Sequence, residues 1–237
     1  LNRADLLIFN GLELEIGWLP NLIIQSRNPE IQPGQAGNLE VASFVNRLID
    51  VPRGAIDRSM GDIHAGGNPH FHHDPSRMIE LLPIIAQRLI QLDPVNKRTY
   101  QDNLARTQAQ FKELLDQARN LFANLSVSQR QVVAYHKSFG YLFETLGLEV
   151  KAYLEPKPGV APTPAHVAKV LALMKREKIG VIVQEAHYPS RTSATVAKLA
   201  RAKMVQVVGG TQEGETYLEH VRDMMTRIYQ AISGENS

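Results

Sequence analysis

The chain has 237 residues, 43% hydrophobic and 21% charged, which is the composition of an ordinary folded protein that can bury a sizeable core. The 26 Lys and Arg residues nearly balance the 24 Asp and Glu residues, and this argues against binding to nucleic acid or to an anionic membrane surface. The absence of cysteine excludes disulfides, thiolate metal sites and a cysteine nucleophile.

The chain opens at Leu1 with neither an initiator methionine nor the layout of a signal peptide, so we expect a processed or trimmed chain. No stretch approaches the ~20 apolar residues that span a bilayer. The apolar run "ADLLIFNG" predicts a buried strand closed by Asn10-Gly11. "LELEIGWLPNLIIQSR" then has helical spacing until Pro20 interrupts it, and "NLEVAS" predicts a second strand.

A histidine-rich loop, "GGNPHFHHDP", occupies residues 66–75. His70, His72 and His73 fall within four positions and His64 lies just upstream, so half of the eight histidines gather here. This density of imidazole favours a metal or catalytic site. The alternative is a surface loop of solvated histidines, with His73 merely capping the next helix.

Pro69 biases the residue before it toward extended backbone. In an extended segment His70 and His72 share one face and His73 points the other way, so at most two of the three converge without a sharp turn. Held between Pro69 and Phe71, His70 is the most constrained, and we expect it to point inward. For His72 or His73 taken alone, a solvated side chain is the better expectation.

Two long helices are predicted next. Asp74 at the N-cap and Pro75 at the first helical position are a strong start for the helix "PSRMIELLPIIAQRLIQL". Asp93-Pro94 opens a second helical stretch that runs to about Leu125. Roughly 30 helical residues span about 45 Å, more than one small domain needs, so we expect this helix to brace two lobes.

Strands and helices then alternate. The segments "RQVVAYH", "EVKAYLE", "GVIVQE" and "MVQVVGG" predict strands, and a helical pattern follows each of them. Four such units predict a parallel sheet with helices on both faces. The expected fold class is therefore α/β, with an N-terminal lobe at 1–92, a linking helix at 93–125 and a C-terminal lobe at 126–237.

Polar side chains follow several of these strands, at the sheet edge where α/β proteins bind ligands. His136 follows the first strand, Glu185 and His187 the third, and Glu213 and Glu215 the last. Imidazole and carboxylate without thiolate suit Zn²⁺, with Mn²⁺ or Fe²⁺ where carboxylates supply more of the ligands. Equally, a lone histidine such as His136 could serve only as a hydrogen-bonding residue of the core.

In this order, "ADLLIFNGLELE", "NPHFHHDP", "VVAYHKSFGYLFETLGLEV" and "EPKPGVAPTPAHVAKVLALMKREKIGVIVQE" resemble the zinc/manganese-type solute-binding proteins of bacterial ABC transporters. The resemblance covers nearly the whole chain. It implies two lobes with parallel sheets, joined by a long rigid helix that limits hinge motion, and a metal ion held in the cleft between lobes. It also implies a periplasmic or extracytoplasmic monomer that performs no chemical step and hands the ion to a membrane permease.

Two residues match the family's ligand positions. His70 corresponds to the histidine of the family's "PHxWxDP"-like motif, and His136 to the histidine or glutamate after the first strand of the C-terminal lobe. The family's N-terminal lobe begins with further βα structure that carries the first histidine ligand, and this chain starts after that point. The resemblance therefore implies a truncated N-terminal lobe.

The remaining ligand is open. In the family it is an Asp or Glu after the last strand, but "GGTQEGETY" has no Asp, so Glu213, Glu215 or Glu185 would have to replace it. Some members also carry a mobile histidine-rich loop near the motif. His64, His72 and His73 look like a short version of that loop.

Zinc is the expected ion, with manganese as the alternative, and binding should weaken below about pH 6 as imidazole protonates. A periplasmic metal buffer or adhesin would use the same site without a permease. A metal-dependent hydrolase would need a carboxylate at a fixed spacing from a histidine pair, as in HExxH, and the sequence has none. A further alternative is a chain that folds but binds metal poorly because a ligand is missing.

Overall fold

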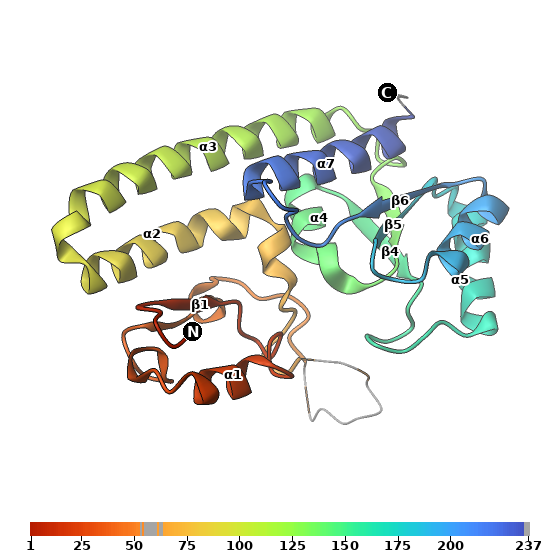
Figure 1. Ribbon diagram of the computed structural model, residues 1–237. Coiled ribbons are helices and arrows are strands. Elements are labelled where there is room, and N and C mark those ends of the chain that lie inside the picture. Colours follow the sequence, from red (N-terminus) through yellow and green to blue (C-terminus); the bar gives the residue numbers. More distant parts are fainter. Residues whose placement is uncertain (53, 55–60, 62–63, 235–237) are drawn as a thin grey trace. The chain divides into compact units, whose positions relative to one another are not determined.

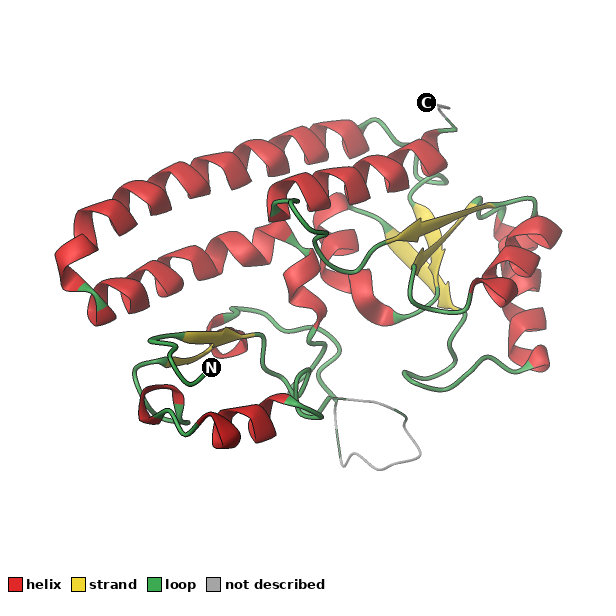
Figure 2. Cartoon of the chain, viewed as in Figure 1, coloured by secondary structure: helices red, strands yellow, loops and turns green. Residues whose placement is uncertain are grey.

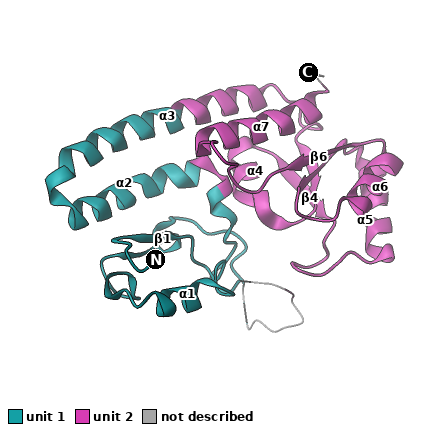
Figure 3. Cartoon of the chain, viewed as in Figure 1, with its two compact units in different colours: residues 1–56, 64–72, 76–112 teal, residues 57–63, 73–75, 113–237 magenta. Residues whose placement is uncertain are grey.

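The computed structural model describes residues 1–52, 54, 61 and 64–234 (Figures 1 and 2). The chain divides into two compact units, coloured separately in Figure 3. Unit 1 consists of Leu1–Ile56, His64–His72 and Ser76–Lys112, and unit 2 of Asp57–Ile63, His73–Pro75 and Glu113–Ser237. None of the helices among the described residues combines the length and the apolar character that crossing a membrane requires.

Unit 1 contains a small parallel sheet of β1 (Leu7–Phe9) and β2 (Asn38–Glu40), so both predicted strands exist. The predicted burial of the first strand is wrong, because Ile8 is 42% exposed, and "NLEVAS" is strand only to Glu40, after which Val41–Phe44 forms a 3₁₀ turn. Helix α1 covers Leu19–Ser26. The prediction that Pro20 interrupts a helix is wrong, because Pro20 lies in the first turn of α1. The backbone N–H groups of that turn have no partner within the helix, so proline costs nothing there.

Helices α2 (Pro75–Leu92) and α3 (Lys97–Ala123) follow. The first begins at Pro75 as predicted. The second starts later than the predicted residue 93, because Pro94–Asn96 forms a turn of 3₁₀ helix. With 27 residues, α3 is about 40 Å long. The boundary between the two units falls within α3, after Lys112.

Unit 2 is built on a four-stranded parallel sheet in the order β4-β3-β5-β6. Each strand leads into a helix, so the four predicted βα units and the α/β fold class are confirmed. The elements are β3 (Gln131–Ala134), α4 (Gly140–Leu146), β4 (Glu149–Tyr153), α5 (Pro164–Glu177), β5 (Val181–Glu185), α6 (Ser190–Ala200), β6 (Lys203–Val207) and α7 (Tyr217–Ser233).

Alternating side chains of the strands fill two separate cores. Val132 and Ala134 of β3 pack with the side of the sheet that α3, α4 and α7 cover. Val133 and Tyr135 pack on the opposite face with α5 and α6 (Figure 1). Burial on both faces explains why the central strands β3 and β5 are mostly apolar. It also leaves the strand ends as the places where polar side chains can lie.

Arg130 ties the ends of two helices together at the amino end of β3. Its Nη2 donates to the carbonyls of Phe122 and Ala123 at 2.8 and 3.2 Å, in the last turn of α3. Its Nη1 donates to the carbonyl of Gly147, which ends α4, at 3.3 Å. The last carbonyls of a helix have no partner within it, so one guanidinium satisfies groups that would otherwise depend on water.

Replacing this guanidinium should destabilise unit 2. Arg130→Ala is expected to lower the free energy of unfolding by about 2 kcal/mol, since hydrogen bonds to a charged group contribute about 1.5–3 kcal/mol. Urea denaturation followed by circular dichroism measures the change. Arg98→Ala is the matched control, because its side chain is 95% exposed and lies 3.8 Å from Asp102. Equal stability of the two variants would contradict the capping role.

Candidate metal site

The histidine segment His70–His73 forms one turn of 3₁₀ helix, so the predicted extended geometry is wrong. The reason lies in Asn68, whose side-chain oxygen accepts the backbone N–H of His70 at 2.9 Å and turns the chain. The Asn68 amide donates to Asp50 at 3.3 Å, which holds its orientation. Pro69 restricts only the residue before it and does not prevent the turn after it.

This turn gathers all three histidines. Each offers a ring nitrogen, and these nitrogens lie within 4.8 Å of one another. The sequence argument that at most two converge therefore fails, because it assumed an extended strand. His73 is only 3% exposed, so its expected solvation is also wrong, while His70 and His72 are partly buried.

The environment of His72 favours its neutral form. Burial lowers the pKa of His72 to about 4, against the opposing effect of a hydrogen bond to the Pro69 carbonyl. A neutral imidazole is the form that binds a metal ion. His72 therefore has a ligand-competent ring nitrogen well below the pH at which an ordinary histidine becomes charged.

His136 follows β3 in extended conformation, before the turn Lys137–Phe139. Its Nδ1 is hydrogen-bonded to Oε2 of Glu155, and the His136 side chain is 12% exposed. A carboxylate only accepts hydrogen bonds, so Nδ1 is the donor, and in the neutral form of the ring the lone pair lies on Nε2. Sequence reasoning missed Glu155, although it follows β4 just as His136 follows β3. The rule of reading strand ends would have found it.

Glu185 ends β5 and is 6% exposed. Its Oε2 accepts a hydrogen bond from the Ser138 hydroxyl, and its Oε1 lies 3.7 Å from Nε2 of His73. A Cβ added at Gly209, after β6, would lie 2.5 Å from the same Oε1. The carboxylate thus lies against Ser138, His73 and Gly209, and a side chain at position 209 would displace it.

The other predicted candidates are Glu213, Glu215 and His64. Glu213 is exposed. Glu215 accepts the backbone N–H of Gln212 at 2.9 Å and lies 3.0 Å from Nδ1 of His220. His64 is partly buried, and its carbonyl accepts the N–H of Gly67 at 3.1 Å.

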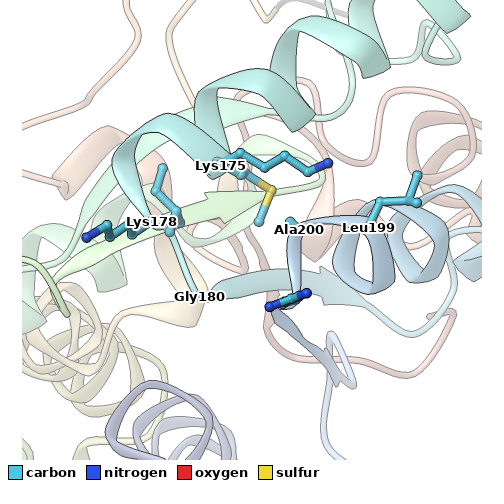
Figure 4. A pocket seen from close by; sticks show the side chains of 8 residues that line it. Lys175, Lys178, Gly180, Leu199 and Ala200 are labelled. Carbon is cyan, nitrogen blue, oxygen red and sulfur yellow. The ribbon is translucent and has the colours of Figure 1, made fainter.

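Two cavities in unit 2 differ in their chemistry. One of about 240 Å³ is lined by His136, Glu155 and His166 among others. The second, of about 550 Å³, lies at the opposite, amino-terminal ends of the strands, between α5 and α6 (Figure 4). Lys175 and Lys178 line it together with Arg201, and it has no imidazole or carboxylate, so it does not suit a metal ion.

The chain is similar in sequence to a known protein family and to several known proteins. The family model of the periplasmic zinc-uptake complex component A, ZnuA, matches residues 1–231. A putative metal-binding protein of Treponema pallidum is 22% identical over 98% of this chain and 73% of its own length. The manganese ABC transporter substrate-binding lipoprotein PsaA of Streptococcus pneumoniae is 23% identical over 98% of this chain and 74% of its own.

Solved structures agree on the fold. The crystal structure of ZnuA superposes with a TM-score of 0.75 at 19% identity, covering 98% of this chain and 80% of that one. The Mn²⁺ complex of FpvC from Pseudomonas aeruginosa gives a TM-score of 0.70 at 22% identity, covering 98% and 81%. The names of these relatives include both zinc and manganese, so they do not choose between the two metals.

The lowered pKa of His72 predicts a specific pH dependence of stability. The folded chain protonates His72 only near pH 4, whereas the unfolded chain does so near pH 6.5. Acid in this window therefore favours the unfolded chain, and the free energy of unfolding rises as the pH increases from about 4 to 6.5. Urea denaturation of the metal-free protein across this window should show a flatter rise for His72→Gln than for the wild type. His187→Gln, which alters an exposed histidine, is the control, and an unchanged slope in His72→Gln would contradict the burial effect.

Proposed function

We propose that this chain, which belongs to the ZnuA family of periplasmic zinc-uptake components, captures zinc and delivers it to a membrane permease. Family membership makes it an extracytoplasmic metal-binding protein of an ABC transporter and not an enzyme. The resemblance drawn from the sequence is thereby confirmed, and the hydrolase alternative is dropped. The choice of zinc, the ligands and the permease as partner belong to the proposal.

The main support for zinc over manganese is that three imidazoles converge on one turn. His70, His72 and His73 supply nitrogen donors, and His136 adds another after β3. Zinc binds imidazole readily, whereas manganese prefers a larger share of oxygen ligands. A donor set so rich in nitrogen therefore favours zinc over manganese.

We propose His70 and His136 as ligands, with His72, His73, His64, Glu185 and Glu213 as further candidates. The buried carboxylates support this ranking, because Glu155 is hydrogen-bonded to His136 and Glu185 accepts from Ser138. Each carboxylate is thus already hydrogen-bonded to a neighbouring side chain, His136 or Ser138, which is why we rank the imidazoles first as ligands. Neutral imidazoles then supply most of the binding, and the ion can be released without any covalent step.

Isothermal titration tests the assignment. Each chain should bind one zinc ion, and it should bind zinc more tightly than manganese. His70→Ala and His136→Ala should each weaken zinc binding by more than about 100-fold. This estimate follows because loss of an outer partner of a ligand alone costs about 10–100-fold. His187→Ala, which alters an exposed histidine, should bind zinc as the wild type does.

Three results would contradict this proposal. Unchanged zinc affinity in both His70→Ala and His136→Ala would mean that the ligands are wrong. Loss of binding in His72→Ala, with full binding in His136→Ala, would place the site on the histidine turn alone. Tighter binding of manganese than zinc would refute the choice of metal.

A further inference from the structure

We propose that Glu155 is a positioning residue that fixes the ring of His136 and presents its Nε2 to the metal ion. This inference rests on the proposed role of His136 as a ligand and assigns a function to a carboxylate that the sequence reasoning did not consider. The contact at its centre is the hydrogen bond between Nδ1 of His136 and Oε2 of Glu155. All the groups involved belong to unit 2.

The burial of the pair makes this contact selective. Glu155 is 7% exposed and the side chain of His136 is 12% exposed, so water competes little for either group. A free imidazole carries its proton on either nitrogen, and a ring protonated at Nε2 cannot bind a metal through that atom. The carboxylate accepts only, so it holds the proton on Nδ1. It thereby removes the tautomer that does not bind and stops rotation of the ring.

Glu155 is itself held in place. Its second oxygen, Oε1, accepts the backbone N–H of Gly159 at 3.0 Å. Gly159 has φ +75°, a conformation that glycine adopts without strain. Pro156 and Pro158 restrict the loop in between, so little conformational freedom is lost when the loop closes on the carboxylate. The loop 156–159 therefore holds the carboxylate of Glu155 in a fixed position.

A second carboxylate in unit 2 lacks this geometry. Glu185 lies 3.7 Å from Nε2 of His73, beyond hydrogen-bond distance, and it accepts from Ser138. Glu155 differs from it because both of its oxygens are engaged, one by the ring and one by the loop. Of these two carboxylates, Glu155 is therefore the one that holds an imidazole ring by a hydrogen bond.

Two substitutions separate the effects of hydrogen bond and charge. In Glu155→Ala the ring loses its acceptor, so zinc affinity should fall about 10–100-fold. ¹⁵N NMR of the metal-free protein should then show the proton of His136 distributed over both ring nitrogens. In Glu155→Gln one amide oxygen remains for two donors, Nδ1 of His136 and the Gly159 N–H. If the oxygen accepts from Nδ1, the tautomer persists while the loop contact is lost, and the loss of affinity should be smaller than in Glu155→Ala. Glu149→Gln is the control, since its carboxylate lies on the same segment, is 62% exposed and pairs with Lys151.

The outcomes distinguish this inference from the proposed function. If Glu155→Ala binds zinc like the wild type while His136→Gln does not, the positioning role is refuted and the ligand assignment stands. Loss of affinity in Glu155→Ala with an unchanged tautomer would also refute positioning, because it would indicate support of the loop alone. If His136→Gln binds zinc normally, the ligand assignment fails, and the inference fails with it.

Discussion

The common direction of the four strands in unit 2 is the constraint on which the rest of the site depends. Parallel strands end at one edge of the sheet, and residues that follow them are gathered there whatever their distance in sequence. His136 follows β3, Glu155 follows β4 and Glu185 ends β5. The central strands β3 and β5 are largely buried, so the polar side chains that follow them lie at the edge of the sheet. The sheet thus sets the position of the imidazole and of the buried carboxylates.

Fixed polar partners give the donor atoms their orientation. Asn68 turns the histidine segment by accepting the backbone N–H of His70. Glu155 holds the ring of His136, and a hydrogen bond from Gly159 holds Glu155. Donors that are ordered before the ion arrives lose less conformational entropy on binding, so more of the interaction energy contributes to affinity. This ordering also suits reversible capture, because no group has to be consumed or rebuilt.

Much of the fold could be predicted from the spacing of apolar residues and from the residues that begin and end helices. The central strands β3 and β5 are mostly apolar and were predicted on that ground, and Asp74-Pro75 predicted the start of α2. Two predictions of local backbone structure were wrong because the presence of a proline does not by itself determine the conformation around it. Pro20 begins a helix that it was expected to interrupt, and Pro69 precedes a turn that was expected to be extended. In the second case a side-chain hydrogen bond, which composition does not show, determined the backbone.

The positions of some candidate side chains could be predicted. His136 and Glu185 stand at strand ends as expected, and both are buried or nearly so, while their role as metal ligands stays a proposal. Glu155 stands at a strand end too, but the sequence prediction placed it inside the strand "EVKAYLE" and did not consider it as a site residue. The proposed role of Glu155 depends on its contact with His136, nineteen positions earlier in the sequence. No periodicity encodes such a pairing, since it follows from the neighbouring positions of β3 and β4 in the sheet.

The central claim is that imidazole nitrogens hold the captured ion. X-ray absorption spectroscopy of the zinc-loaded chain at the zinc edge tests it most directly. The predicted spectrum has a first shell with Zn–N distances of about 2.0–2.1 Å and the multiple-scattering pattern of at least two imidazole rings. A first shell of oxygen atoms alone, without imidazole scattering, would contradict the account.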